Sequence, residues 1–273
     1  MSKENNIRIF QDTMNLIETD SELLRTLVGV DVAHRNTFLY VPNPDGVQRV
    51  RSGKTYAKKE SLTKERTIEC ALRLSKETAG RIAVLNFASP KRPGGGVITG
   101  ASAQEEAICR ITDLYPRLCA MRDKGLFYSN NRRSPYTDEV IYSRDVTVIK
   151  PDENEPRLLA ENERILIDVV TCAAPNQTGQ KIPDQELYGI IRRRTARVLD
   201  ACIENGAVNV VLGAWGCGAF CNPPKIVAQA MMDEMADKYT FSFNNIVFAV
   251  YTREYEQENY DVFAETRRWL YYP

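Results

Sequence analysis

The sequence predicts an α/β protein with three layers, α/β/α, around a largely parallel or mixed central sheet. Nearly continuous apolar runs rich in β-branched residues, of which Ile165–Cys172 (ILIDVVTC) is the clearest, are typical of strands covered on both faces. Between such runs lie segments with apolar residues at three- and four-residue spacing, which indicate helices. This alternation favours a sheet with helices on both sides. No repeat, low-complexity tract or linker divides the 273 residues, so we expect one domain.

The N-terminal part predicts helices first and strands later. Residues 7–28 carry apolar residues at mostly helical spacing, with a break and a possible cap near Thr19–Ser21, which indicates a helix or a helix pair. The alternating run FLYVP, residues 38–42, indicates a strand. Lys58–Ala79 predicts a helix with Gly80 just beyond its end, and this helix leads into a strand over Ile82–Phe87.

In the middle of the chain, the sequence predicts one helix, two short strands and a long second helix. The first helix begins near Ala103, and we expect Pro116 to end it. Val140–Tyr142 and Val146–Ile149 indicate short strands, and Asp184–Asn205 indicates a helix. The arginines of that helix could contact a polyanion, but a solvated helix face is the favoured interpretation; they are Arg192, Arg193, Arg194 and Arg197.

The last part continues the alternation. Val208–Leu212 indicates a buried strand, and Pro224–Lys238 a helix whose opening prolines suit a first turn, because a proline lacks the N–H that would be unpaired there. Ile246–Tyr251 indicates the final strand, and Tyr255–Leu270 a C-terminal helix.

Composition narrows the function classes. The 36 basic and 36 acidic residues cancel, so no global field draws the protein to nucleic acid or to an acidic membrane, and a polyanionic ligand needs a local site. Seven cysteines, an odd number, favour reduced thiols and a cytoplasmic location. The N-terminus lacks an apolar signal core, and no apolar run approaches the roughly 20 residues that span a bilayer.

The sequence contains little that indicates a metal-binding site. The single histidine, His34, excludes a multi-histidine zinc site and argues against a Ser-His-Asp enzyme. Cys217 and Cys221 are four residues apart, but no second cysteine pair has matching spacing. We therefore expect neither a metal site nor a cofactor.

The most informative stretch runs from Val84 to Leu118 and reads as a strand, a glycine loop and an acidic helix start. Consecutive glycines, Gly94–Gly96, let backbone N–H groups approach an anion such as a diphosphate. The helix start would hold Gln104, Glu105 and Glu106 in fixed orientation beside that loop. Alternatively, the glycines form only a tight turn and the acids only complement the helix dipole.

A second glycine loop, GAWGCGAFCNPP over residues 213–224, precedes another helix start. Its alternative interpretation is a glycine-rich turn packed around Trp215. Both glycine loops and the Ala173–Asn176 loop leave the carboxyl ends of predicted strands, where ligands bind in such folds.

The triple glycine followed after seven residues by Gln-Glu-Glu resembles the signature of microbial-type poly(ADP-ribose) glycohydrolases, which are built on a macrodomain. The resemblance extends over VLNFASPKRPGGG, CAAPN, VLGAWGCGAFCNPP and IVFAV, and spans about Ile7 to Val250. It implies a macrodomain-like fold with added N-terminal helices. The expected single catalytic domain covers residues 1–273, with a core at about 58–252, an N-terminal helical extension at about 1–57 and a C-terminal helix at about 255–270.

The resemblance also implies roles for individual residues. Glu106 would be the general acid and base, and Glu105 would hold hydroxyls of the ribose that is cleaved. Asn86 and Ser89 stand where macrodomains carry asparagines near the ribose, although a serine has a shorter reach. The other expected ADP-ribose ligands, with Phe220 pressing on the distal ribose and the two loops gripping the diphosphate, are Gly94, Gly95, Gly96, Val97, Gln104, Gly216, Cys217, Gly218, Ala219 and Phe220. For adenine, Asn176, Phe248 and Tyr251 are weak candidates.

Three functions remain open from the sequence. The first is hydrolysis of the ribose-ribose bond of poly(ADP-ribose), the second is removal of single ADP-ribose groups or hydrolysis of an ADP-ribose ester, and the third is binding of ADP-ribose without turnover. The acid pair Glu105 and Glu106 speaks against the third, because a binding module needs no acid. The expected partners are ADP-ribose, its polymer or ADP-ribosylated macromolecules, with no membrane and no general nucleic-acid binding. A monomer is the default.

Overall fold

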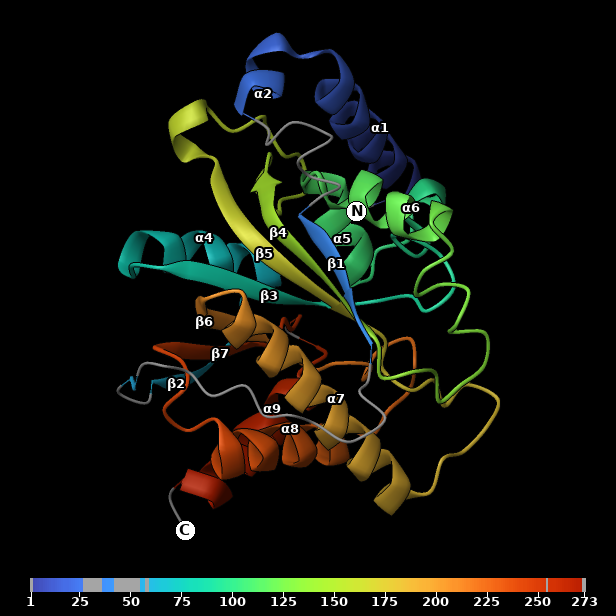
Figure 1. Cartoon of the computed structure of the whole chain (residues 1–273), viewed down its shortest axis with the longest axis vertical. Coiled ribbons are helices and arrows are strands. Elements are labelled where there is room, and N and C mark those ends of the chain that lie inside the picture. The colour runs from blue at the N-terminus through green and yellow to red at the C-terminus, as the bar shows by residue number, and fades with distance from the viewer. Residues whose placement is uncertain (1, 27–35, 42–54, 57–58, 254, 272–273) are drawn as a thin grey trace.

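The computed structural model describes residues 2–26, 36–41, 55–56, 59–253 and 255–271, and these form an α/β fold around a seven-stranded sheet (Figure 1). The elements are α1 (Lys3–Thr19), α2 (Ser21–Thr26), β1 (Thr37–Tyr40), β2 (Glu60–Thr63), α4 (Thr67–Glu77), β3 (Arg81–Phe87), η1 (Val97–Thr99), α5 (Gln104–Ile111), α6 (Leu114–Asp123), β4 (Val140–Val148), η2 (Glu161–Glu163), β5 (Ile165–Cys172), α7 (Asp184–Glu204), β6 (Ala207–Leu212), α8 (Pro224–Lys238), β7 (Asn245–Ala249) and α9 (Glu258–Tyr271).

The sheet is mixed, as the sequence predicts. Its strand order is β1-β4-β5-β3-β6-β7-β2. The pairs from β5 through β3, β6 and β7 to β2 are parallel, with Ala83 of β3 opposite both Asp168 of β5 and Val210 of β6. At the other edge of the sheet, the pairs β1–β4 and β4–β5 are antiparallel. The carboxyl ends of β3, β6 and β7 therefore meet on one side of the sheet, where the glycine loops emerge.

Alternating residues of the central strands fill a core on each face of the sheet. In β3, Ala83 and Leu85 contribute to the core under α7, α8 and α9, whereas Ile82 and Val84 contribute to the core under α1, α4, α5 and α6. Successive side chains of a strand point to opposite faces, so a run such as RIAVLNF must be apolar throughout to be covered on both. The predicted three-layer arrangement is confirmed.

Several predicted elements have the expected bounds, and the N-terminal helices break where predicted. Helix α8 begins at Pro224 and ends at Lys238, and α7 covers Asp184–Glu204. Asp20 separates α1 from α2, and its Oδ1 accepts a hydrogen bond from the N–H of Leu23 at 2.7 Å. No described helix combines the length and the apolar character that crossing a bilayer requires. The predicted role of His34 falls outside the described residues.

Other elements differ from the prediction. Pro116 does not end a helix, because α5 already ends at Ile111 and Pro116 lies in the first turn of α6, where a missing N–H costs nothing. The two short strands predicted after it are one strand, β4, whose register shifts between Ser143 and Val146. The strand β1, by contrast, lies at the sheet edge where the run FLYVP predicted a strand.

Three arginines of α7 form ion pairs, and the prediction of a solvated face is wrong for the buried Arg194, whereas Arg193 is exposed. Arg194 is fully buried and pairs with Asp138 at 2.8 Å, and Arg193 pairs with the same carboxylate. Arg192 pairs with Glu234 and Asp237 of α8. These side chains join α7 to its neighbours and do not form an open basic patch.

Candidate active site

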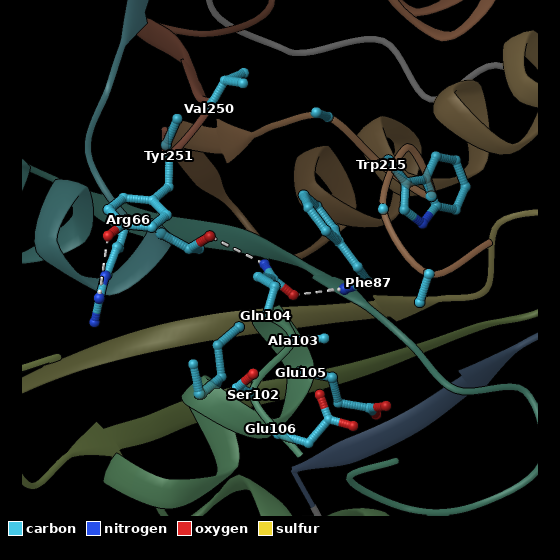
Figure 2. A pocket seen from close by; sticks show the side chains of 18 of the residues that line it. Arg66, Phe87, Ser102, Ala103, Gln104, Glu105, Glu106, Trp215, Val250 and Tyr251 are labelled. Carbon is cyan, nitrogen blue, oxygen red and sulfur yellow. Dashed lines mark hydrogen bonds between the residues drawn. The ribbon is translucent and has the colours of Figure 1, made fainter. Parts of the chain in front are cut away.

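A cavity of about 420 Å³ opens at the carboxyl ends of the parallel strands, between the start of α5 and the loop that follows β6 (Figure 2). Segments far apart in the chain contribute to its wall. Its lining residues are Arg66, Thr67, Ile68, Phe87, Ser89, Ser102, Ala103, Gln104, Glu105, Glu106, Ala107, Ile108, Asp152, Asn154, Ala174, Ala214, Trp215, Gly216, Gly218, Ala219, Phe220, Ala249, Val250, Tyr251, Arg253 and Asn259.

Gln104, the first residue of α5, joins this helix to the end of β3. Its Oε1 accepts a hydrogen bond from the N–H of Phe87 at 2.8 Å, and its Nε2 donates to the carbonyl of Leu85 at 2.7 Å and to Oγ1 of Thr67 at 3.0 Å (Figure 2). The side chain therefore completes the hydrogen bonding of a strand end and fixes the start of α5. Gln104 lines the cavity, but its polar atoms are engaged by the protein itself.

Glu105 is buried and held by donors on the β3 side. Its Oε2 accepts from the N–H of Ser89 at 2.6 Å, and its Oε1 accepts from Nδ2 of Asn86 at 3.3 Å. Asn86 is itself fully buried and also donates to Oγ1 of Thr171 at 3.1 Å. Asn86 therefore faces Glu105 and is not part of the cavity wall, whereas Ser89 lines the cavity.

The surroundings of the acid pair favour retention of a proton. Burial is the largest cause of the rise in the pKa of Glu105 to about 8; the charge of Glu106 contributes to this rise, and the hydrogen bonds from Ser89, Asn86 and Gly94 oppose it. Near neutral pH Glu105 therefore retains a proton.

Glu106 presents one bound and one unbound oxygen. Its Oε1 accepts a hydrogen bond from the N–H of Gly96 at 2.8 Å. Its Oε2 is buried and has no hydrogen-bond partner among the described residues. A buried carboxylate oxygen without a partner is costly, and this one belongs to a residue of the cavity wall. Oε2 is therefore the atom best placed to bind, or to protonate, a group in the cavity.

The first glycine loop wraps around these carboxyl groups. Gly94 and Gly95 have φ of +62° and +58°, and a Cβ on Gly95 would lie 2.4 Å from Oε1 of Glu106. The N–H of Gly95 donates to the carbonyl of Arg92, and that of Val97 donates to the carbonyl of Gly94, both at 3.0 Å.

The predicted role of this loop in binding a diphosphate is therefore not supported by its geometry. The N–H groups of Gly95, Gly96 and Val97 already have acceptors within the protein, the N–H of Gly94 is turned to Glu105, and none of the four residues lines the cavity. Gly95 is needed because the chain passes there against two carboxylates, whereas a Cβ at Gly94 would meet Tyr115 and one at Gly96 would meet Ala101.

The second glycine loop, residues 216–220, faces the cavity. In the described part of the chain, the backbone N–H groups of Gly216, Gly218, Ala219 and Phe220 donate to no protein acceptor, and these four residues line the cavity. A Cβ on Gly218 would meet nothing within 4 Å. Successive free N–H groups in such a turn form an anion-binding nest.

Buried residues hold this second loop in place. Gly216 has φ of +74°, and a Cβ there would lie 2.4 Å from Nδ2 of Asn222. The buried Trp215 donates from Nε1 to the carbonyl of Cys172 at 3.1 Å. Cys217 points away from the cavity wall, and burial raises the pKa of its thiol to about 12. The turn is thus both packed around Trp215 and open to the cavity, which combines the two interpretations of the sequence.

The end of the cavity near Tyr251 contains residues that the sequence did not reveal. The guanidinium of Arg66 lies over the ring of Tyr251, 4.6 Å from its centroid, and donates to the hydroxyl of Tyr251 at 3.4 Å (Figure 2). It also donates to Oδ1 of Asp152 at 2.9 Å. Of the weak adenine candidates, Tyr251 lines the cavity, Phe248 is buried in the core, and Asn176 binds Ser134 outside the wall.

The described residues bring together no group of three or more histidine, cysteine, aspartate or glutamate side chains that could hold a metal ion. The polar groups of the cavity wall include carboxyls, guanidiniums, hydroxyls, amides and backbone N–H groups, which suits the binding and protonation of an organic anion such as a nucleotide sugar.

Comparison with protein-family models shows to which family the chain is similar. The family model described as "Microbial-type PARG, catalytic domain" matches residues 11–151, which is just over half of the chain. No curated protein matches it.

Solved structures agree with the family model. Poly(ADP-ribose) glycohydrolase (PARG) from Thermomonospora curvata is 30% identical with a TM-score of 0.81, and the match covers 96% of this chain and 99% of that one. The same enzyme bound to the inhibitor ADP-HPD is 29% identical over the same shares, with a TM-score of 0.79. PARG from Deinococcus radiodurans in complex with ADP-ribose is 30% identical, covers 89% and 98%, and has a TM-score of 0.77. The chain therefore belongs to the family of microbial-type PARG catalytic domains.

Proposed function

We propose that this chain hydrolyses the ribose-ribose O-glycosidic bond of poly(ADP-ribose) and releases ADP-ribose, with Glu106 as general acid and then general base. The observation that carries the proposal is that, within the described ranges of the chain, Oε2 of Glu106 has no partner and is buried in the wall of a cavity that also contains the free N–H groups of Gly216, Gly218, Ala219 and Phe220. An acid beside an anion nest is what cleavage of a glycosidic bond near a diphosphate requires.

The diphosphate is proposed to bind to the second glycine loop alone. Related PARG structures contain ADP-ribose or ADP-HPD, and in this chain the loop at Gly216–Phe220 has N–H groups without acceptors. Phe220 would press on the distal ribose from the same loop. Its ring already lies against Tyr136, with centroids 6.4 Å apart, so the aromatic surface is held in place.

The first glycine loop is proposed to position the carboxyls of Glu105 and Glu106. Gly96 holds Oε1 of Glu106, which leaves Oε2 to face the bond that is cleaved. Glu105 would bind hydroxyls of the same ribose, with its carboxyl fixed by Asn86 and Ser89. In this account Gly94–Val97, Gln104 and Asn86 position the catalytic groups, and Ser89 is the residue of the β3 side that reaches the cavity wall.

The chemical steps follow from this arrangement. In the proposed reaction Oε2 of Glu106 gives a proton to the departing ribose oxygen as the bond to the anomeric carbon breaks, and an oxocarbenium-like centre develops. The neighbouring diphosphate stabilises that positive charge. Glu106, now ionised, accepts a proton from water as the water attacks the anomeric carbon, and the pair regains its starting state.

The proposal extends to the whole chain. We propose one catalytic domain over residues 1–273 that acts on the polymer in the cytoplasm, as a monomer. The seven cysteines are all unpaired, in keeping with a reducing compartment.

The test is to offer the purified protein poly(ADP-ribose) and, separately, protein carrying single ADP-ribose groups, and to measure the ADP-ribose released. Release of ADP-ribose from the polymer is expected. Release only from the singly modified protein would assign the cavity to the other hydrolase reaction, and binding of ADP-ribose without any release would make the chain a binding module.

A further inference from the structure

The N-terminal helix α1 lies against the loop that carries the first glycines, next to α5 and α6 (Figure 1). The contact is close and polar. Asn6 is buried, and its Nδ2 donates to the carbonyl of Gly100 at 2.9 Å. Gly100 has φ of +78°, and a Cβ there would lie 2.4 Å from the carbonyl oxygen of Lys3. The backbone of the loop thus touches the first turn of α1 directly.

Two hydrogen bonds and the short backbone segments between them connect Gly100 to the carboxyl of Glu106. Ala101 follows Gly100 in the chain, and its N–H donates to the carbonyl of Gly96 at 3.1 Å. The N–H of Gly96 then donates to Oε1 of Glu106 at 2.8 Å. Nη1 of Arg110, on α5, holds the carbonyl of Ala101 at 2.7 Å from the other side. A displacement of Gly100 would therefore move the donor that orients Glu106.

Helix α1 is itself firmly fixed on α5 and β4. Oγ1 of Thr13 donates to the carbonyl of Arg110 at 2.6 Å. The buried Nζ of Lys150 donates to Oδ2 of Asp12 at 2.5 Å. The rings of Phe10 and Tyr115 pack edge to face, with their centroids 5.0 Å apart. Tyr115 also packs over Gly94, since a Cβ on Gly94 would lie 2.8 Å from Cδ2 of Tyr115. The helix can therefore serve as a rigid support for both ends of the loop.

We propose that α1 positions the catalytic carboxyl, and that Asn6 is the residue through which it acts. The inference rests on the proposed function and deepens it. Asn6 touches neither the cavity nor a ligand, so it is a positioning residue. The diphosphate loop at residues 216–220 receives none of these contacts. Loss of Asn6 should therefore impair turnover and leave the binding of ADP-ribose intact.

The test is Asn6→Ala, with Ile17→Ala as matched control. Ile17 is buried on the same helix but packs against Leu23 and Ile149, away from the loop. Since Oδ1 of Asn6 has no partner among the described residues, the alanine also removes an unpartnered buried oxygen, and the variant should fold. We expect Asn6→Ala to lower kcat on the polymer about tenfold, the factor that corresponds to about 1.4 kcal/mol, with KM and the Kd for ADP-ribose changed less than about threefold.

Two further measurements separate positioning from lost stability. Looser packing would admit water to the acid pair, so the alkaline limb of the pH profile should move to lower pH in Asn6→Ala and stay in place in Ile17→Ala. Amide hydrogen exchange should quicken at residues 96–101 and not at 216–222, a readout that needs no turnover. If Asn6→Ala fails to fold, Thr13→Val, which removes the bond to the Arg110 carbonyl together with a bond to the Ile9 carbonyl within α1, should give the same pattern more weakly.

The results that would overturn the inference are specific. An unchanged kcat in Asn6→Ala, or losses in kcat that match those of Ile17→Ala at equal stability, would reduce α1 to a structural element. So would unchanged exchange at residues 96–101. An inactive wild-type protein would instead defeat the proposed function, while the exchange experiment would still report on the contact between α1 and the loop.

Discussion

The backbone N–H of Gly96 donates to Oε1 of Glu106 at 2.8 Å, while the other oxygen of that carboxyl is buried without a partner among the described residues. The two glycine loops therefore have different roles. The loop at residues 94–97 orients an acid, and the loop at residues 216–220 offers its N–H groups to the cavity. Substitutions in the two loops should therefore affect different kinetic quantities.

Gly95→Ala should impair turnover more than binding. The residue has φ of +58°, and the new Cβ would lie 2.4 Å from Oε1 of Glu106, so the carboxyl or the loop must shift. Misplacement of a catalytic group by about 1 Å can cost about 10²-fold. We expect kcat on the polymer to fall by that order, while calorimetry gives an ADP-ribose Kd within about tenfold of the wild type, or about 1.4 kcal/mol. A Kd that weakens as much as kcat would return the first loop to ligand binding.

Gly218→Val should show the opposite pattern. A Cβ at Gly218 meets no atom within 4 Å, so the variant should fold with little change in melting temperature. The larger side chain would occupy space beside the free N–H groups of the loop and hinder a diphosphate. We expect the ADP-ribose Kd to rise at least about tenfold, equivalent to about 1.4 kcal/mol. Undiminished affinity in calorimetry would remove the second loop from diphosphate binding.

The rate should depend on pH through the acid pair. Because its surroundings, burial above all, raise the pKa of Glu105 to about 8, Glu105 loses its proton as the pH rises through about that value, and a reaction that depends on this proton slows. We expect kcat on the polymer to decline on the alkaline side with an apparent pKa near 8. A rate that stays constant well above that pH would show that the pair donates no proton in the limiting step.

The same pKa has a consequence for stability. The folded protein keeps a proton on Glu105 that the unfolded carboxyl, with its ordinary value of 4.5, releases. This contribution to stability is fully present below pH 4.5 and is lost as the pH rises through about 8. The difference in free energy of unfolding between the wild type and Glu105→Gln should therefore shift against the wild type across that window, as measured by denaturant titration at several pH values.

The sequence predicted those parts of the fold that have a local cause. Helix α8 could be bounded because prolines stand at its start, and β5 because its run of apolar and β-branched residues, interrupted only by Asp168, is typical of a buried strand. The strand β2 was missed since its residues, ESLT, are all half-buried and show no alternation. The continuity of β4 was missed because its pattern is interrupted at Asp145, which has φ of +54°.

The site could be predicted where a motif is continuous in the chain, and not where tertiary contacts create it. Gln104, Glu105 and Glu106 lie at a helix start beside the cavity, as the sequence predicted. The neighbourhood of Arg66, Asp152 and Tyr251 could not be foreseen, because these residues come from three distant loops that only the folded sheet brings together. Nor does a run of glycines reveal whether its N–H groups face a ligand or a neighbouring carboxylate, as at Gly96.

The most direct test of the account is the turnover of poly(ADP-ribose) by Glu106→Gln. The glutamine keeps an oxygen to accept the hydrogen bond from Gly96, but the amide that replaces Oε2 is not acidic and cannot transfer a proton. The account predicts that kcat falls by at least about 10², as for a lost general acid, while the ADP-ribose Kd stays within about tenfold of the wild-type value, or about 1.4 kcal/mol. Turnover equal to that of the wild type would contradict it.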